Sequence, residues 1–123
     1  MINVRELAKK STVLAAIMED RTKGDTEELI ARKEVVHIID CELCTITNEG
    51  AEDRVWAYTI KEEPKKFYFA GYVLKKIFES ILDECEGDYT EMYSAVSSQG
   101  IPVKFSQQKT KDGKRVFTAV EVM

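Results

Sequence analysis

The chain has 123 residues, of which 44% are apolar and 33% are charged. This length suits a single domain, and the composition supports a buried core, which excludes intrinsic disorder. The apolar runs are far shorter than the roughly 20 residues of a membrane-spanning helix, and the first residues lack the apolar stretch of a secretory signal. We therefore expect a cytoplasmic location and no membrane association. The 3 cysteines agree with this expectation, because an odd number of cysteines is typical of reduced thiols.

The net charge of −4 is unevenly distributed along the chain. Segments 34–63 and 79–100 each carry −6, whereas 64–78 carries +4 and 101–123 carries +3. A fold that gathers the two basic segments on one face would create a positive surface on a negative protein.

Residues 1–33 are predicted to form a helical N-terminal extension. Residues 20–24 are polar and indicate a turn. Asp25 followed by Glu28 is a capping pattern typical of the start of a short helix. We expect this extension to lie on the main domain, residues 34–123.

From residue 34 the apolar pattern changes to a period of two, which predicts strands. A long strand is expected up to a turn at residues 48–50, and a second strand spans about 54–61. Pro64 then turns the chain into a third strand at 66–70, because proline fixes φ and cannot donate to a ladder.

The period then returns to that of a helix. An apolar stripe at helical spacing predicts an amphipathic helix over residues 72–85. The stripe consists of Leu74, Ile77, Phe78, Ile81, Leu82 and Cys85. A second Asp-x-x-Glu pattern, Asp88 with Glu91, predicts a short helix over 88–98.

The end of the chain is predicted to form a β-hairpin. Its Asp112–Gly113 pair is typical of a two-residue type I′ turn. That turn pairs Val103 with Val122 and gathers the apolar residues of both strands on one face. Phe117 then lies beside Gln108 on the opposite face. A shift by one residue would break both faces, which determines the register.

The predicted order is three strands, a helix and two strands after the helical extension. This β-β-β-α-β-β order is that of the OB-fold, so the fold class we expect is α+β, mainly β, with a five-stranded OB-like barrel. The alternatives are a generic α+β sandwich and an SH3-like barrel. The SH3-like barrel has no place for a long helix after its third strand.

Aromatic and basic residues are interleaved in the two positive segments. Such a composition suits single-stranded nucleic acid, because cations follow the phosphates and rings stack on bases. OB-folds bind oligonucleotides on the face of strands two and three, between the loops joining strands one to two and four to five. The candidate nucleic-acid-binding residues are Trp56, Tyr58, Lys65, Lys66, Tyr68, Lys104, Lys109, Lys111, Lys114, Arg115 and Phe117.

A structural role is the alternative for several of these residues. Trp56 and Tyr58 share one apolar strand face, which favours a core position for at least one of them. Phe67 and Phe69 are expected in the core, with Tyr68 on the other face of the strand. Cations at a hairpin tip are also typical of a solvated edge strand.

A metal site is not expected. Cys41 and Cys44 form a CxxC pattern with His37 upstream, but residues three apart in a strand point to opposite faces. The acidic clusters lack the spacing of a calcium loop, and no nucleotide-binding or nucleophile motif is present. We expect no catalytic residues and no cofactor.

Three segments of the chain resemble a family. RTKGDTEELI, EEPKKFYFAGYVLKKIF and VKFSQQKTKDGKRVFTAVEV are similar to small proteins of phages and prophages of Gram-positive bacteria. In that group the second segment recurs as a turn with the pattern acidic-Pro-x-x-aromatic-x-aromatic-x-Gly. The order of elements also resembles that of phage OB-fold single-stranded DNA-binding proteins. This resemblance implies that Trp56, Tyr58, Tyr68 and the hairpin cations lie near the DNA.

Two functions are therefore expected from the sequence. The first is a phage-type, non-catalytic protein that binds single-stranded DNA with weak sequence preference in replication or recombination. The second is an interaction module that docks on host or phage proteins through its acidic segments. Homo-oligomerisation through an exposed strand is compatible with both.

Overall fold

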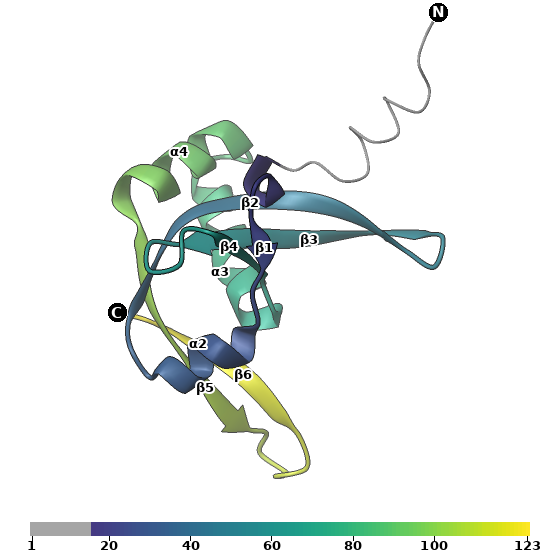
Figure 1. The fold of residues 1–123 in the computed structure, drawn as a ribbon, viewed down its shortest axis with the longest axis vertical. Coiled ribbons are helices and arrows are strands. Elements are labelled where there is room, and N and C mark those ends of the chain that lie inside the picture. Colours follow the sequence, from purple (N-terminus) through teal and green to yellow (C-terminus); the bar gives the residue numbers. More distant parts are fainter. Residues whose placement is uncertain (1–15) are drawn as a thin grey trace, which may run out of the picture.

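The computed structural model describes residues 16–123, and the first 15 residues of the predicted helical extension lie outside the described residues. Residues 16–123 form a six-stranded sheet with three α-helices and one short 3-10 turn (Figure 1). Its elements are η1 (Ala16–Met18), β1 (Thr22–Lys23), α2 (Thr26–Arg32), β2 (Val36–Asn48), β3 (Ala51–Ile60), β4 (Lys66–Phe69), α3 (Tyr72–Glu84), α4 (Tyr89–Gln99), β5 (Ile101–Lys109) and β6 (Val116–Val122). No helix in this part of the chain is long and apolar enough to cross a bilayer.

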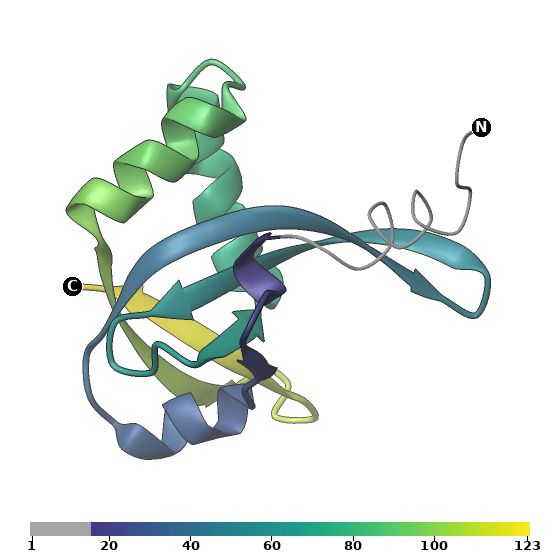
Figure 2. The same cartoon turned by 45° about the horizontal axis from the view of Figure 1, so that its top comes forward.

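The sheet is strongly curled but does not close (Figure 2). Its strand order is β1-β4-β3-β2-β5-β6, so β1 and β6 are the two edges. All neighbours are antiparallel except β1 and β4. The expected five-stranded barrel is therefore corrected to a six-stranded half-barrel. β1 pairs only with Lys66 and Phe67 of β4, and a pocket lined by Phe69, Leu74 and Val120 separates the end of β4 from β6.

The predicted strands and helices downstream of residue 34 are confirmed to within a few residues. The two Asp-x-x-Glu patterns both mark helix starts, as expected. The Asp25 carboxylate accepts a hydrogen bond from the N–H of Glu27 at 3.0 Å, and the Asp88 carboxylate accepts one from the N–H of Glu91 at 3.1 Å. Strand β1 was not predicted, because its two residues lie within the polar segment assigned to a turn.

The predicted hairpin register is confirmed, and the predicted turn type is wrong. Val103 faces Val122, and Gln108 faces Phe117. Only Gly113 of the expected turn has a positive φ, 71°, whereas a type I′ turn needs two such residues. Instead the Asp112 carboxylate accepts hydrogen bonds from the Thr110 hydroxyl and from the N–H of Lys114, which fixes a longer loop.

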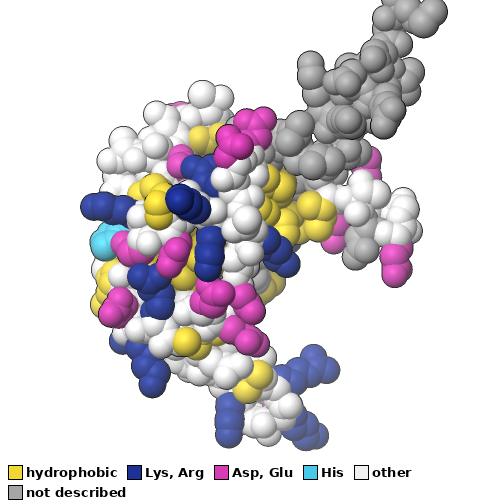
Figure 3. Space-filling view, in the orientation of Figure 1, with side chains coloured by type: hydrophobic (Ala, Val, Ile, Leu, Met, Phe, Trp, Pro, Cys, Tyr) yellow, Lys and Arg dark blue, Asp and Glu magenta, His cyan; other side chains and the backbone are white. Residues whose placement is uncertain are grey.

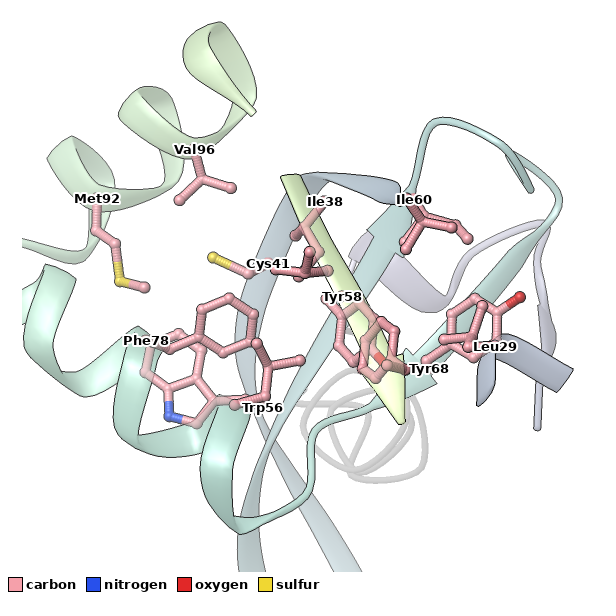
Figure 4. Close-up of a cluster of buried hydrophobic side chains, with 14 residues drawn as sticks. Leu29, Ile38, Cys41, Trp56, Tyr58, Ile60, Tyr68, Phe78, Met92 and Val96 are labelled. Carbon is pink, nitrogen blue, oxygen red and sulfur yellow. The ribbon is translucent and has the colours of Figure 1, made fainter. Parts of the chain in front are cut away.

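The main core lies on one face of the sheet, here called the inner face. It carries Trp56, Tyr58 and Ile60 of β3, as the shared strand face predicted, and is covered by all three helices (Figure 4). Each helix contributes large buried side chains. These are Leu29 of α2, Leu74 and Phe78 of α3, and Met92 and Val96 of α4.

A smaller apolar cluster lies on the opposite, outer face. Ile17 of η1 packs there with Cys44, Ala57 and Phe67. Both faces of the central strands are therefore apolar. Alternation therefore groups the residues of one strand by face, but it does not show that both faces are buried.

Candidate nucleic-acid interface

The structure separates the predicted binding residues into a buried group and an exposed group. Trp56, Tyr58 and Tyr68 are all buried in the main core. Trp56 packs against Phe78 with ring centroids 5.3 Å apart, and Tyr58 packs against Tyr68 at 5.6 Å. Their ring faces are occupied by other side chains. The expectation that these three rings stack on bases is therefore corrected.

The prediction for β4 is corrected in part: Phe67 is buried as expected, but Tyr68 on the other face is buried as well. Tyr68 points into the main core, whereas Phe67 and Phe69 lie on the outer face. The Tyr68 ring passes so close to Gly24 that a Cβ at residue 24 would lie 2.3 Å from it. The segment that joins β1 to α2 thus packs directly against the Tyr68 ring. Burial, followed by the carboxylate of Glu63, raises the pKa of the Tyr68 phenol.

The lysines of the first basic segment do not join the hairpin cations. The Lys66 ammonium forms an ion pair with Glu28 of α2 at 3.0 Å. Together with the ion pair between Arg32 and Glu63, also at 3.0 Å, it ties α2 to the β3–β4 turn. Lys65 is exposed at the same turn. Local sequence patterns gave no indication of these two ion pairs, because the partners in each pair are more than 30 residues apart in the chain.

The remaining cations lie on a projecting β-ribbon. We call residues 107–117, at the end of β5 and the start of β6, the basic arm. It carries Lys109, Lys111, Lys114 and Arg115, all exposed, whereas Lys104 lies nearer the body opposite Glu121. Among the described residues no ion pair involves these four cations, and the one carboxylate of the arm, Asp112, accepts hydrogen bonds within the loop. Those hydrogen bonds, first that from Thr110, lower the pKa of Asp112.

Phe117 is the aromatic residue of the basic arm. It is 43% exposed and lies beside Gln108, on the face opposite the core, as the register predicted. An exposed ring close to four cations matches what a single strand requires of a protein, a stacking surface beside phosphate contacts.

A second ribbon projects elsewhere and has the opposite charge. We call residues 45–54, the end of β2 and the start of β3, the acidic arm. It carries Glu49, Glu52 and Asp53 with Arg54 at its base. The two arms project from different parts of the body (Figure 1). In the space-filling view dark blue side chains surround the lower arm, and magenta ones lie on the arm at the right (Figure 3).

One further cation lies over an aromatic ring that the sequence did not assign to a site. The Lys23 ammonium lies 5.3 Å from the centroid of the half-buried Phe69 ring on the outer face. This contact follows from the pairing of β1 with β4, which the sequence analysis did not predict.

The CxxC cysteines lie on opposite faces of β2, as the strand geometry predicted. Cys41 belongs to the main core and Cys44 to the outer cluster. Burial, followed by the nearby carboxylates, raises the pKa of the Cys41 thiol to about 12. His37 lies at the exposed start of β2, where its Nδ1 contacts Glu62 at 2.9 Å. Across residues 16–123, no three metal-ligating side chains converge.

Comparisons with protein-family models, with curated proteins and with solved structures found no match.

Proposed function

We propose that this protein binds single-stranded nucleic acid stoichiometrically, with weak sequence preference and without catalysis, through the basic arm. The observation that carries the proposal is the group of four exposed cations that form no ion pair within the described residues, next to the exposed ring of Phe117. Backbone phosphates supply most of the affinity in such complexes, and rings add a sequence-tolerant contribution.

The arrangement of strands supports this proposal by analogy. An OB-fold is a partly open five-stranded barrel, and the loops joining strands one to two and four to five flank its ligand. Counting from β2, these loops correspond to the tips of the acidic arm and the basic arm. An OB-like ancestry would thus place the cations at a position that OB-folds use for oligonucleotides. The resemblance to phage proteins suggests replication or recombination as the setting and single-stranded DNA as the ligand.

The experiment is a salt titration of oligonucleotide binding. For single strands the logarithm of affinity falls with the logarithm of salt concentration by about 0.7 per phosphate neutralised. Replacing Lys109, Lys111, Lys114 and Arg115 with serine should therefore flatten the slope by about three units. The matched control removes the same charge elsewhere, by replacing Lys33, Lys61, Lys75 and Lys76 with serine, and should leave most of the slope intact.

Phe117→Ala tests the stacking contact separately. A stacking ring contributes about 1–3 kcal/mol per base at any salt concentration, so binding should weaken at a nearly unchanged slope. All variants need circular dichroism spectra that match the wild type. A wild-type protein that binds no oligonucleotide at low salt would show that the proposal is wrong.

A second candidate function is docking on a basic protein surface. The observation that favours it is the corner between α3 and α4, where every charged side chain is acidic and exposed. The corner consists of Asp83, Glu84, Glu86, Asp88 and Glu91. Replacing these residues with their amides should not weaken oligonucleotide binding if the basic arm is the site, and should abolish capture of the partner if docking is the function.

A further inference from the structure

A pocket of about 180 Å³, here called the seam pocket, lies between β6 and the end of β4. Phe69 of β4 and the start of α3 line one side of it, and Thr118 and Val120 of β6 line the other. Three buried side chains of the main core also line it, namely Tyr58, Leu74 and Phe105. The seam pocket therefore combines apolar walls with the edges of two strands.

The backbone groups of β6 that face the seam pocket have no partner strand. In the last hairpin the N–H of Met123 donates to the carbonyl of Pro102 at 2.9 Å. Because hydrogen-bonded pairs alternate along an antiparallel ladder, the odd-numbered residues of β6 bond to β5. Thr118 and Val120 therefore direct their N–H and C=O groups away from β5 and toward the seam.

The end of β4 presents a second unpaired edge to the pocket. The N–H of Ala70 donates to the carbonyl of Trp56 at 2.8 Å, so Phe69, one residue earlier, directs its N–H and C=O groups away from β3. Strand β1 does not reach this position, because it pairs only with Lys66 and Phe67. The pocket thus has hydrogen-bond donors and acceptors on both of its sides.

These features define the class of ligand. A hydrocarbon would leave the strand-edge groups buried without partners, which costs free energy for each group. A flat ring with donors and acceptors at its edge would pair with them while it fills the apolar interior, and an unpaired nucleobase has this character. Size then favours one ring over two, because a cavity of about 150 Å³ holds benzene.

The surroundings of the pocket also suit a nucleotide. A second hollow of about 440 Å³ shares Thr26 and Phe69 with the seam pocket and includes Lys23. Within residues 16–123 the Lys23 ammonium forms no ion pair. The carboxylates of this hollow are already engaged, Asp25 in the cap of α2 and Glu28 in an ion pair. Lys23 is therefore available to a phosphate that adjoins a bound base.

We infer that the seam pocket binds one pyrimidine base of the single strand that the basic arm holds. The inference rests on the proposed function and adds a preference at one nucleotide. Phe117, the exposed ring of the arm, directly precedes Thr118 of the pocket. Because successive side chains point to opposite faces of a strand, the nucleic acid crosses the edge of β6 between the stacked base and the inserted one. A free pyrimidine nucleoside has the same chemistry, and the test distinguishes the two sources.

Val120→Phe fills the pocket and leaves every residue of the basic arm unchanged. Val122→Phe is the matched control, because it makes the same substitution on the same face of β6 at a residue that does not line the pocket and is 52% exposed. The affinities for oligothymidine and oligoadenosine are measured for the wild type and both variants, and circular dichroism checks their folds. Val73→Phe fills the pocket from α3 and serves as a second variant if Val120→Phe does not fold.

We expect the wild type to prefer oligothymidine by about tenfold, the lower end of what a size-limited pocket provides. Stacking within an adenine strand also favours pyrimidines, so the comparison of variants is decisive. Val120→Phe should lose this preference and keep its salt slope, whereas Val122→Phe should retain both. Equal wild-type affinities for the two strands, or an unchanged preference in Val120→Phe, would overturn the inference and leave the basic arm in place.

A titration with free nucleosides separates this inference from the proposed function. Thymidine should shift the amide NMR signals of Phe69, Thr118 and Val120 in the wild type but not in Val120→Phe, and adenosine should shift them in neither. These shifts without any oligonucleotide binding would show a nucleoside site and contradict the proposed role of the basic arm. Signals that do not move with thymidine up to about 10 mM, ten times the dissociation constant of a weak complex, would overturn the inference even if oligonucleotides bind.

Discussion

At the scale of single residues, an aromatic ring whose faces pack against other side chains belongs to the core and is not available to a ligand. Phe78 of α3 packs on Trp56 with ring centroids 5.3 Å apart and on Tyr58 at 6.2 Å, and it is fully buried. It connects α3 to the centre of β3, so its truncation tests whether the helix is integral to the fold.

Phe78→Ala should lower the free energy of unfolding by about 3–5 kcal/mol, because the transfer and cavity terms add. A urea or guanidinium melt measures the change. Tyr72→Ala is the matched control on the same helix. The Tyr72 side chain is 73% exposed, and we expect its removal to change stability by at most about 0.5 kcal/mol. Equal losses in the two variants would contradict the assignment of Phe78 to the core.

A substitution at Gly24 tests a second close contact, between the segment joining β1 to α2 and the Tyr68 ring. A Cβ at residue 24 would lie 2.3 Å from the Tyr68 ring, so either the ring or the backbone must move. Gly24→Ala should therefore destabilise the protein by about 1–3 kcal/mol, the usual cost of overpacking. Gly71→Ala is the control, since no atom lies within 4 Å of a Cβ built there. A thermal or denaturant melt of the pair measures the difference.

At the scale of elements, polar contacts join segments that are distant in sequence. The Glu62 carboxylate accepts hydrogen bonds from the backbone N–H of His37 at 2.7 Å and contacts the His37 ring at 2.9 Å. This contact fixes the start of β2 against the end of β3. Burial tends to raise the pKa of Glu62, but the hydrogen bonds from His37 outweigh it and lower the pKa below the ordinary 4.5.

The lowered pKa of Glu62 predicts a dependence of stability on pH. A carboxyl that titrates lower in the folded than in the unfolded state stabilises the protein above the unfolded pKa, and this contribution disappears as the pH falls through the folded pKa. Glu62→Gln should therefore cost stability at neutral pH, and the cost should shrink as the pH falls below 4.5. Denaturant melts across this range measure it, with the exposed Glu34→Gln as control. A cost that is the same at every pH would rule out this linkage.

At the scale of the whole molecule, a compact body carries two ribbons of opposite charge. The body holds both apolar clusters, whereas the arms extend beyond the three helices (Figure 2). Local opening should therefore need least free energy in the arms and most in the central strand.

Amide hydrogen exchange should follow this division. The amides of residues 56–60, buried on both faces of β3, should exchange most slowly, and those of residues 47–52 and 110–114 should exchange fastest. Uniform protection across arms and body would contradict this description of the molecule.

Local patterns in the sequence were sufficient for the elements downstream of residue 34 and for the last hairpin register. Both Asp-x-x-Glu caps, the apolar stripe of α3 and the alternation around Val103 and Val122 depend on neighbours within a few positions. The separation of Cys41 from Cys44 is equally local, since it follows from the pleat of one strand.

Tertiary structure alone decided the closure of the sheet, the faces of β4 and the membership of the site. Strand β1 has only two residues, too few for a periodic signal, yet it forms one edge of the sheet. Tyr68 and Trp56 are aromatic residues of the kind that stack on bases, but both lie in the core because the central strands are buried on both faces. The ion pair of Lys66 with Glu28 likewise depends on two segments 38 residues apart meeting in space, which removed one cation from the interface and left the basic arm as the candidate site.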